Sequence, residues 1–141
     1  APIWDIAFSP DGQLLASAGN DAIAKLWTLD GKLLYALKGH QASVWSIAFS
    51  PDSQTIASGS GDATVKLWSR DGRFLKTLNG HRAAIWGIAF SADGTLIATA
   101  SIDETVKLWS REGALISTLK GHRSGIRGLT FHPNQKMLAS A

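Results

Sequence analysis

The stretch that decides the fold runs from Gly39 to Trp68 and reads GHQASVWSIAFSPDSQTIASGSGDATVKLW. It returns as residues 80–109, and its first part returns again from residue 121. The step is 41 residues without insertion or deletion, since 81 − 40 = 41 and 122 − 81 = 41 for the histidines. A fixed period of this length indicates an architecture built from repeated units. Three sets of residues keep the step: His40, His81 and His122; Trp27, Trp68 and Trp109; Asp21, Asp62 and Asp103.

Each period is predicted to form four short antiparallel strands. The segments rich in β-branched and aromatic residues are the expected strands, and the Gly, Pro, Asp and Ser residues between them favour tight turns such as Ser50–Ser53. No segment shows a helical period, so almost no helix is expected. The strands expected in the second period are Val44–Phe49, Thr55–Ser60, Thr64–Trp68 and Phe74–Leu78.

The Gly-His opening, the Asp before the third strand and the Trp that closes it resemble the WD40 repeat, and the resemblance covers the whole chain. The Trp-Asp dipeptide of that family is absent, because Thr28, Ser69 and Ser110 follow the tryptophans. The second and third periods share 23 of 41 aligned residues, which is similar to the highly repetitive WD40 arrays of bacteria.

The resemblance implies an all-β fold, a WD40-like β-propeller segment of four-stranded antiparallel blades with about 3.5 blades per chain. The expected units are residues 1–38, 39–79 and 80–120 as three blades, and 121–141 as a half blade that holds only its first two strands. The family further implies a scaffold that binds proteins or peptides and carries no enzymatic activity.

Composition narrows the range of functions. The chain of 141 residues is long enough for one domain with a core, and it contains no cysteine, so disulfides and thiolate metal sites are excluded. No apolar run approaches the roughly 18 residues that span a bilayer, and a cytoplasmic location is expected. No pair of histidines has metal-ligand spacing, so no metal or cofactor is expected.

Charge is unevenly distributed along the chain. Residues 1–70 hold five Lys/Arg and six acids, a net −1, whereas residues 71–141 hold nine Lys/Arg and five acids, a net +4. The bias weakly favours an acidic partner. A nucleic-acid partner is not expected, because such proteins usually show a denser basic stripe.

The resemblance implies a hydrogen-bonded structural brace in each blade, made of a His, a Ser or Thr hydroxyl, an Asp and a Trp. The second and third blades hold full sets, and the first and last hold partial ones. A Ser58–His40–Asp62 hydrolytic triad is the alternative, but repetition in every blade argues against catalysis. The expected members are His40, Ser58, Asp62, Trp68, His81, Thr99, Asp103, Trp109, Ser17, Asp21, Trp27, His122 and Ser140.

A second candidate site is an aromatic series at the start of each first strand. Two interpretations stay open: the tryptophans form a partner-binding surface, or they pack between adjacent blades. Nearby arginines could favour acidic or phosphorylated peptides. The candidate partner-binding residues are Trp4, Trp45, Trp86, Arg127, Arg82 and Arg123.

The half blade leads to an expectation about assembly. Terminal blades of a repeat protein expose apolar faces that neighbours would otherwise bury. We therefore expect the chain either to be a fragment or half of a larger propeller, or to be a self-associating structural module that completes a propeller by oligomerisation and has no other ligand. The simplest form is a two-fold dimer. The surfaces expected in contact are Ile3–Phe8, Ile126–Phe131 and Met137–Ala141.

Overall fold

The computed structural model describes residues 1–134 and 137–141, and these residues form fourteen strands and no helix. Three four-stranded antiparallel meanders and one two-stranded hairpin follow one another along the chain. The first sheet holds β1 (Ile3–Phe8), β2 (Leu14–Gly19), β3 (Ile23–Thr28) and β4 (Leu33–Lys38). The second holds β5 (Val44–Phe49), β6 (Thr55–Ser60), β7 (Val65–Ser69) and β8 (Phe74–Leu78). The third holds β9 (Ile85–Phe90), β10 (Leu96–Ser101), β11 (Thr105–Ser110) and β12 (Leu115–Lys120), and the hairpin pairs β13 (Leu129–Phe131) with β14 (Leu138–Ser140).

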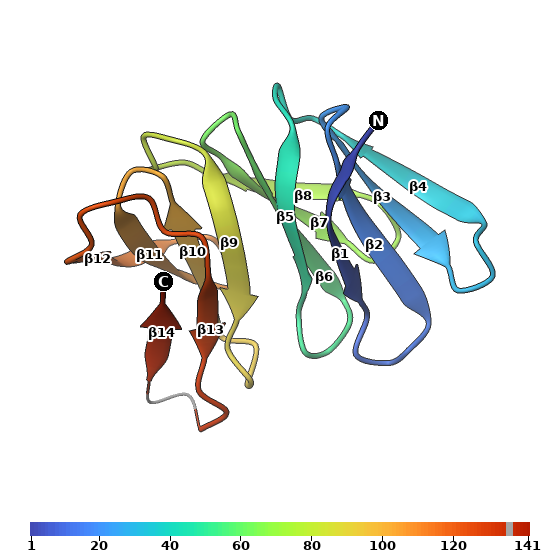
Figure 1. Cartoon of the computed structure of the whole chain (residues 1–141). Helices are drawn as coiled ribbons and strands as arrows, with labels where there is room; N and C mark the ends of the chain where they lie inside the picture. Colours follow the sequence, from blue (N-terminus) through green and yellow to red (C-terminus); the bar gives the residue numbers. More distant parts are fainter. Residues whose placement is uncertain (135–136) are drawn as a thin grey trace.

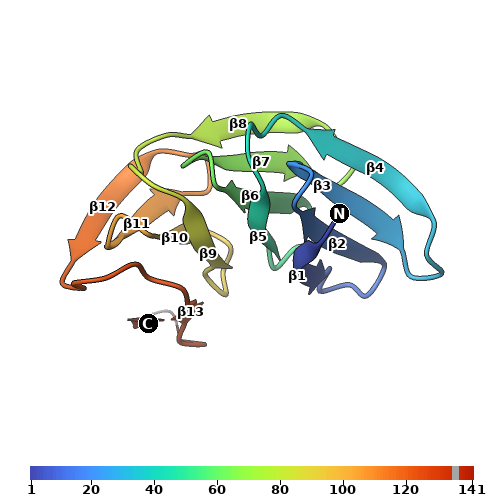
Figure 2. The same ribbon diagram turned by 45° about the horizontal axis from the view of Figure 1, so that its top comes forward.

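The sheets stand side by side as blades along an open arc (Figure 1). The first strand of each sheet, β1, β5, β9 and β13, lies on the inside of the arc, and β4, β8 and β12 lie on its outer side (Figure 2). The fold class expected from the sequence, a WD40-like β-propeller segment, is confirmed.

The core lies between neighbouring blades. The inner strand β5 of the second blade packs on β1 and β2 of the first. One buried cluster therefore joins Leu14, Ala16 and Leu26 of the first blade to Val44 and Phe49 of the second. Each blade depends on its neighbour for the burial of its apolar face, as in other repeat proteins.

The half blade has shorter strands than the complete blades. Its strands are Leu129–Phe131 and Leu138–Ser140, which lie within the segments Ile126–Phe131 and Met137–Ala141 expected in contact with a partner. Pairing continues beyond them, because Gly128 and Ala141 exchange backbone hydrogen bonds at 2.9 and 3.0 Å, and the amide of Arg127 donates to the same Ala141 carbonyl oxygen at 2.7 Å. In the second blade the third strand begins at Val65 rather than Thr64, whereas the equivalent strand of the third blade begins at Thr105.

Ion pairs join neighbouring blades at the rim that carries the turn between the first and second strands. Arg70 of the second blade donates to the Asp11 carboxylate of the first. One period later, Nη2 of Arg111 lies 2.7 Å from Oδ2 of Asp52. The same pair of positions therefore connects the first blade to the second and the second to the third.

Candidate functional site

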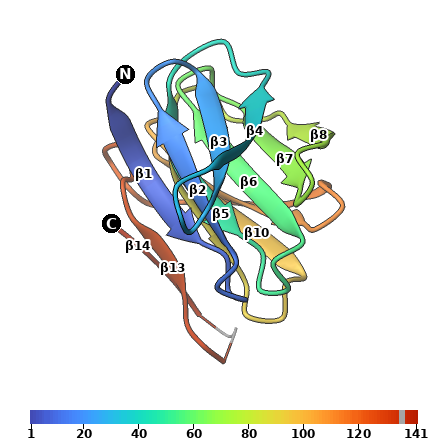
Figure 3. The same cartoon turned by 90° about the vertical axis from the view of Figure 1, so that its right-hand side faces the viewer.

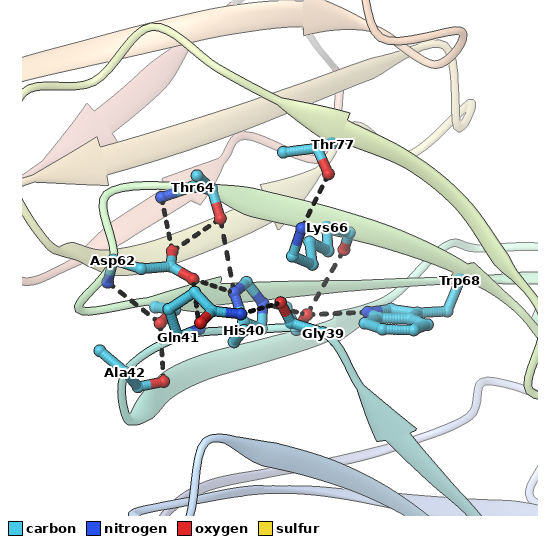
Figure 4. Close-up of polar contacts among 11 residues, drawn as sticks. Gly39, His40, Gln41, Ala42, Asp62, Thr64, Lys66, Trp68 and Thr77 are labelled. Carbon is cyan, nitrogen blue, oxygen red and sulfur yellow. Dashed lines mark hydrogen bonds and ion pairs between the residues drawn. The ribbon is translucent and has the colours of Figure 1, made fainter.

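The second blade brings His40, Ser58, Asp62 and Trp68 into one hydrogen-bonded chain. Figure 4 shows His40 with Asp62 on one side and Trp68 on the other. His40 comes from the loop between β4 and β5, Ser58 from β6, Asp62 from the turn between β6 and β7, and Trp68 from β7. Nδ1 of His40 lies 2.9 Å from Oδ2 of Asp62, and its Nε2 lies 2.8 Å from Oγ of Ser58. Nε1 of Trp68 donates to the same Oγ at 2.8 Å. The blade's loop, turn and two central strands are thus held at one point.

The electrostatics determine where the protons sit. Burial raises the pKa of Asp62, but hydrogen bonds from Thr64, Gln41 and His40 outweigh burial and lower that pKa to about 2. Burial lowers the pKa of His40, and its hydrogen bond with Asp62 offsets that effect only in part. A neutral His40 beside an ionised Asp62 must carry its proton on Nδ1. Nε2 then accepts from the Ser58 hydroxyl, whose oxygen accepts from Trp68.

The third blade repeats this arrangement with a threonine as the hydroxyl residue. Nδ1 of His81 lies 2.8 Å from Oδ2 of Asp103, and its Nε2 lies 2.7 Å from Oγ1 of Thr99. Nε1 of Trp109 donates to that hydroxyl at 2.9 Å. Hydrogen bonds from Thr105, Arg82 and His81 outweigh burial and lower the pKa of Asp103 to about 2.

The first blade keeps half of the arrangement. Nε1 of Trp27 donates to Oγ of Ser17 at 2.9 Å. Asp21 has no histidine at the corresponding place in this chain, and its carboxylate pairs instead with Nζ of Lys25 at 2.6 Å. The hydrogen bond from Lys25 lowers the pKa of Asp21.

The half blade keeps the other half. Nε2 of His122 lies 2.7 Å from Oγ of Ser140. His122 is exposed, whereas the equivalent His40 of the complete second blade is buried.

The sequence interpretation missed one residue type in this network. Oγ1 of Thr64 donates to Oδ1 of Asp62 at 2.6 Å, and Thr105 does the same for Asp103 at 2.6 Å. The signal was present in the sequence, since these threonines also keep the 41-residue step and Ile23 occupies the position in the blade that lacks the histidine.

The Ser58–His40–Asp62 geometry has the connectivity of a hydrolytic triad, but the hydroxyl is enclosed. Ser58 has no exposed surface, and its oxygen already accepts the Trp68 indole N–H. A nucleophile must reach a substrate carbonyl beside an oxyanion site. Burial between two central strands gives a substrate no approach to this oxygen.

The second candidate site is a hollow of about 420 Å³ lined by Trp4, Trp45, Trp86 and Arg127, hereafter the tryptophan hollow. The rings of Trp45 and Trp86 stack with centroids 5.5 Å apart and planes 23° from parallel. The guanidinium of Arg127 lies 4.7 Å from the centroid of Trp86. Trp4 is 55% exposed, and its Nε1 donates to Oδ1 of Asn20 at 3.3 Å. The aromatic residues therefore both pack across blade boundaries and leave ring surface open.

Each tryptophan owes its position to a β-bulge. Ile3 pairs with Gly19 and Asp5 pairs with Ala18, so Trp4 between them has no partner in β2. The same irregularity leaves Trp45 unpaired in β5 and Trp86 unpaired in β9. A bulge bends its strand and re-aims a side chain. The three rings are thereby directed into one hollow, which strand alternation alone does not predict.

The other two candidate arginines do not share that surface in the same way. Arg82 lines a different hollow, of about 530 Å³, together with Glu104, Lys107 and His122. Its backbone N–H donates to Oδ2 of Asp103 at 2.9 Å, which holds this residue next to the brace rather than beside the tryptophans. Arg123 is exposed in the loop that precedes β13.

Residues 1–134 and 137–141 contain no group of three or more His, Cys, Asp or Glu residues that could hold a metal ion. Over the same residues, no helix has the length and apolarity needed to cross a membrane.

Comparison with known families gives one match. The family model described as "WD domain, G-beta repeat" matches residues 1–28, 31–69, 72–110 and 113–141. Each matched unit of 39 residues joins the last strand of one sheet to the first three strands of the next, as residues 31–69 do with β4 and β5–β7. A search of curated proteins found no match.

Proposed function

Because the chain belongs to the WD40 family, we propose that it is a non-enzymatic scaffold that binds proteins or peptides at the tryptophan hollow. WD40 repeats generally form protein-interaction scaffolds, and the family typically has no catalytic role. We further propose which residues contact the partner and what kind of peptide the partner is.

The observation that carries the proposal is the composition of the hollow. Three tryptophan rings and one arginine converge at the inner strands, and Trp4 is 55% exposed. Tryptophan and arginine are the residues most enriched among the side chains that dominate binding energy at protein interfaces. A rigid aromatic surface also loses little conformational entropy when a partner binds.

Arg127 supports an acidic or phosphorylated ligand. No ion pair found among the described residues involves this arginine, although its guanidinium lies over Trp86. Guanidinium N–H donors that are held in place by a ring can bind a carboxylate or phosphate with two parallel hydrogen bonds. We therefore assign to the hollow a peptide with an apolar or aromatic residue next to an acidic one.

Selection from a random peptide library on the immobilised chain tests this assignment. Selected peptides should be rich in Asp and Glu, and their affinity should fall at least tenfold for Trp45→Ala and for the charge reversal Arg127→Glu. Arg73→Glu is the matched control, since Arg73 is exposed in the turn between β7 and β8 at the opposite rim. An equal loss with Arg73→Glu, or with substitutions in the Ser50–Ser53 turn, would overturn the choice of surface.

The absence of catalysis is proposed from the burial of the Ser58 hydroxyl. Ser58→Ala should leave any slow hydrolysis of p-nitrophenyl acetate by the chain unchanged. Loss of that hydrolysis with Ser58→Ala, while the variant stays folded, would instead assign the brace a chemical role.

Self-association is a second candidate function, and the surface of β1 favours it. Ile3, Ile6 and Phe8 are 52%, 56% and 62% exposed. They belong to β1, the inner strand of the blade at one end of the arc (Figure 3). An apolar strip of this kind on an inner strand marks an interaction site. Molar mass in solution over a range of concentrations tests this function independently of any peptide ligand.

A further inference from the structure

The exposed strip of β1 has internal counterparts that show what would cover it. Ile3, Ile6 and Phe8 occupy the same repeat positions as Val44, Ile47 and Phe49 in β5. In β5 these side chains are 0%, 5% and 8% exposed, because the first blade lies against them. In β1 the exposed fractions are 52%, 56% and 62%. The exposed fractions differ because a preceding blade packs against β5 and no preceding blade packs against β1 among the described residues. The surface that fits β1 is therefore the one that the first blade turns toward β5.

The half blade presents that face and leaves it open. Leu14, Ala16 and Ala18 of β2 belong to the buried cluster against β5 and are 7%, 0% and 0% exposed. Three periods later the same repeat positions hold Met137, Ala139 and Ala141, in β14 and directly beside it. All three are exposed. Met137 is 62% exposed. One molecule thus carries both halves of an interface that it already uses between its own blades.

We propose that a second copy of this chain docks head to tail, with its β13–β14 hairpin packed on β1 of the first copy. The inference rests on the proposed self-association and fixes its geometry. It specifies which faces meet, and a dimer that closed both such contacts would keep the two-fold symmetry expected from the sequence, since a two-fold axis pairs β1 of each copy with the hairpin of the other.

The ion pairs between blades support the same junction. At the first two internal boundaries an arginine meets an aspartate, Arg70 with Asp11 and Arg111 with Asp52. In a head-to-tail contact the corresponding positions are Leu29 of one copy and Asn134 of the other. The arginine and the aspartate are replaced together, and Leu29 is 57% exposed. Neither copy would therefore bring an unmatched charge to the new boundary.

The aromatic series also continues across this junction. Along the arc the inner positions read Trp4, Trp45, Trp86 and Arg127; Trp86 stacks on Trp45, and the guanidinium of Arg127 lies over Trp86. Docking head to tail would place Arg127 of one copy next to Trp4 of the other. The exposed ring of Trp4 offers this cation a second aromatic face.

A complementation experiment tests the geometry, with light scattering as the readout. The wild-type chain should reach at least twice its 15.0 kDa mass as its concentration rises. Ile6→Glu on β1 and Ala139→Glu on β14 should each stay at 15.0 kDa, and an equimolar mixture of the two should return to twice that mass. In the mixture, the intact hairpin of the Ile6→Glu chain can dock on the intact β1 of the Ala139→Glu chain. This recovery requires that the two faces are different and complementary. Leu34→Glu on the outer strand β4 is the matched control and should behave as wild type.

The possible results separate the two claims. A wild-type mass of 15.0 kDa at every concentration would overturn self-association and the geometry together. A wild-type dimer with no recovery in the mixture would overturn only the head-to-tail contact. All three substituted side chains are at exposed or half-exposed positions, and circular dichroism confirms that each variant keeps its strands.

A second pair of variants tests the boundary at Leu29 and Asn134. The double variant Leu29→Arg/Asn134→Asp recreates the ion pair of the internal boundaries across the two copies. It should lower the concentration of half-association by about 1.4- to 5-fold, the range for an exposed ion pair. Leu29→Asp/Asn134→Asp should raise that concentration instead. No difference between these two double variants would contradict the proposed contact.

Discussion

At the scale of single residues, the brace is a chain of donors that ends on one ionised carboxylate. Trp68, Ser58, His40 and Asp62 each satisfy the next group in a buried part of the blade. Such a network stabilises the fold because every member has a partner, and removal of one member leaves another unpaired in a region without water. The repeats provide a natural comparison, since Asp21 stands at the same position without a histidine and with a partly exposed lysine partner.

Substitutions in the complete brace should lower the free energy of unfolding. Asp62→Ala and Trp68→Phe should each cost about 1–3 kcal/mol, because a buried donor or acceptor loses its partner. Chemical denaturation measures the change. Asp21→Ala is the matched control and should cost less than about 1 kcal/mol, as expected for an exposed ion pair. Unchanged midpoints for both brace variants would contradict the assignment.

The stability should also depend on pH below about 6.5. The pKa values of His40 and His81 are lowered from 6.5 in the folded chain, chiefly by burial. In the window below 6.5 the unfolded chain therefore binds protons that the folded chain does not, so the free energy of unfolding falls as pH falls. The greatest slope is about 1.4 kcal/mol per pH unit for each histidine. Asp62 and Asp103, with pKa values of about 2, add a second decline between pH 3.8 and 2.

Denaturation at pH 7 and pH 5 checks this pH dependence. The double variant His40→Gln/His81→Gln should be less stable at pH 7 and should lose most of the slope between these two values. His132→Gln, at an exposed histidine outside the brace, should keep the wild-type slope. A slope that persists in the double variant would place its origin elsewhere.

At the scale of strands, the size of the residue at one position of the inner strand is matched to the size of its partner in the next strand. Ser46 in β5 pairs with Gly59 in β6, and Gly87 in β9 pairs with Ala100 in β10. A Cβ on Gly59 would lie 2.7 Å from Oγ of Ser46 and 2.6 Å from Cγ2 of Ile85 in the next blade. Where the inner residue is Gly87, the neighbouring strand has room for alanine. Ser46 Oγ has no hydrogen-bond partner among the described residues, so this serine fills space without a polar contact.

Exchange of this pair between blades gives a prediction about packing. Gly59→Ala should lower the free energy of unfolding by about 1–3 kcal/mol through overpacking. Ser46→Gly should partly reverse that loss in the double variant, which copies the Gly87–Ala100 pair of the third blade. A double-mutant cycle by denaturation measures the coupling. Strictly additive effects would show that Ile85, rather than Ser46, limits the space.

At the scale of the whole molecule, the blades form an open arc with two different unpartnered faces. Exposed apolar surface costs about 25 cal/mol per Å², so an apolar strip on an inner strand favours association. The head-to-tail contact would bury β1 of one copy and the hairpin of the other without a new type of interface. Repeat proteins gain stability in this way, from each added boundary between units.

Association of this kind should make thermal stability depend on concentration. A partner that binds only the folded chain raises its apparent stability by mass action. The unfolding midpoint of the wild type should rise by about 2 °C for each tenfold increase in concentration. Ile6→Glu should show a midpoint that is independent of concentration over the same range. Differential scanning calorimetry of both chains distinguishes the two cases, and an invariant wild-type midpoint would contradict association.

The sequence by itself determined the architecture of this protein. The 41-residue step, the β-branched and aromatic residues of segments such as Val44–Phe49 and the turn residues between strands predict four-stranded blades, since strand propensity and turn chemistry are local properties of the chain. The residues of the brace could also be named, because the resemblance to the WD40 repeat implies a brace and the 41-residue step locates its members in each blade.

Only the tertiary structure decided how the two candidate surfaces are formed. Bulges at Trp4, Trp45 and Trp86 turn three rings into one hollow, and the register that produces a bulge depends on the partner strand. The exposure of Ile6 against the burial of Ile47 likewise depends on a neighbouring blade rather than on the side chain itself. β1 and β5 place apolar residues at the same three positions, so what distinguishes a buried face from a docking face is the presence or absence of a neighbouring blade.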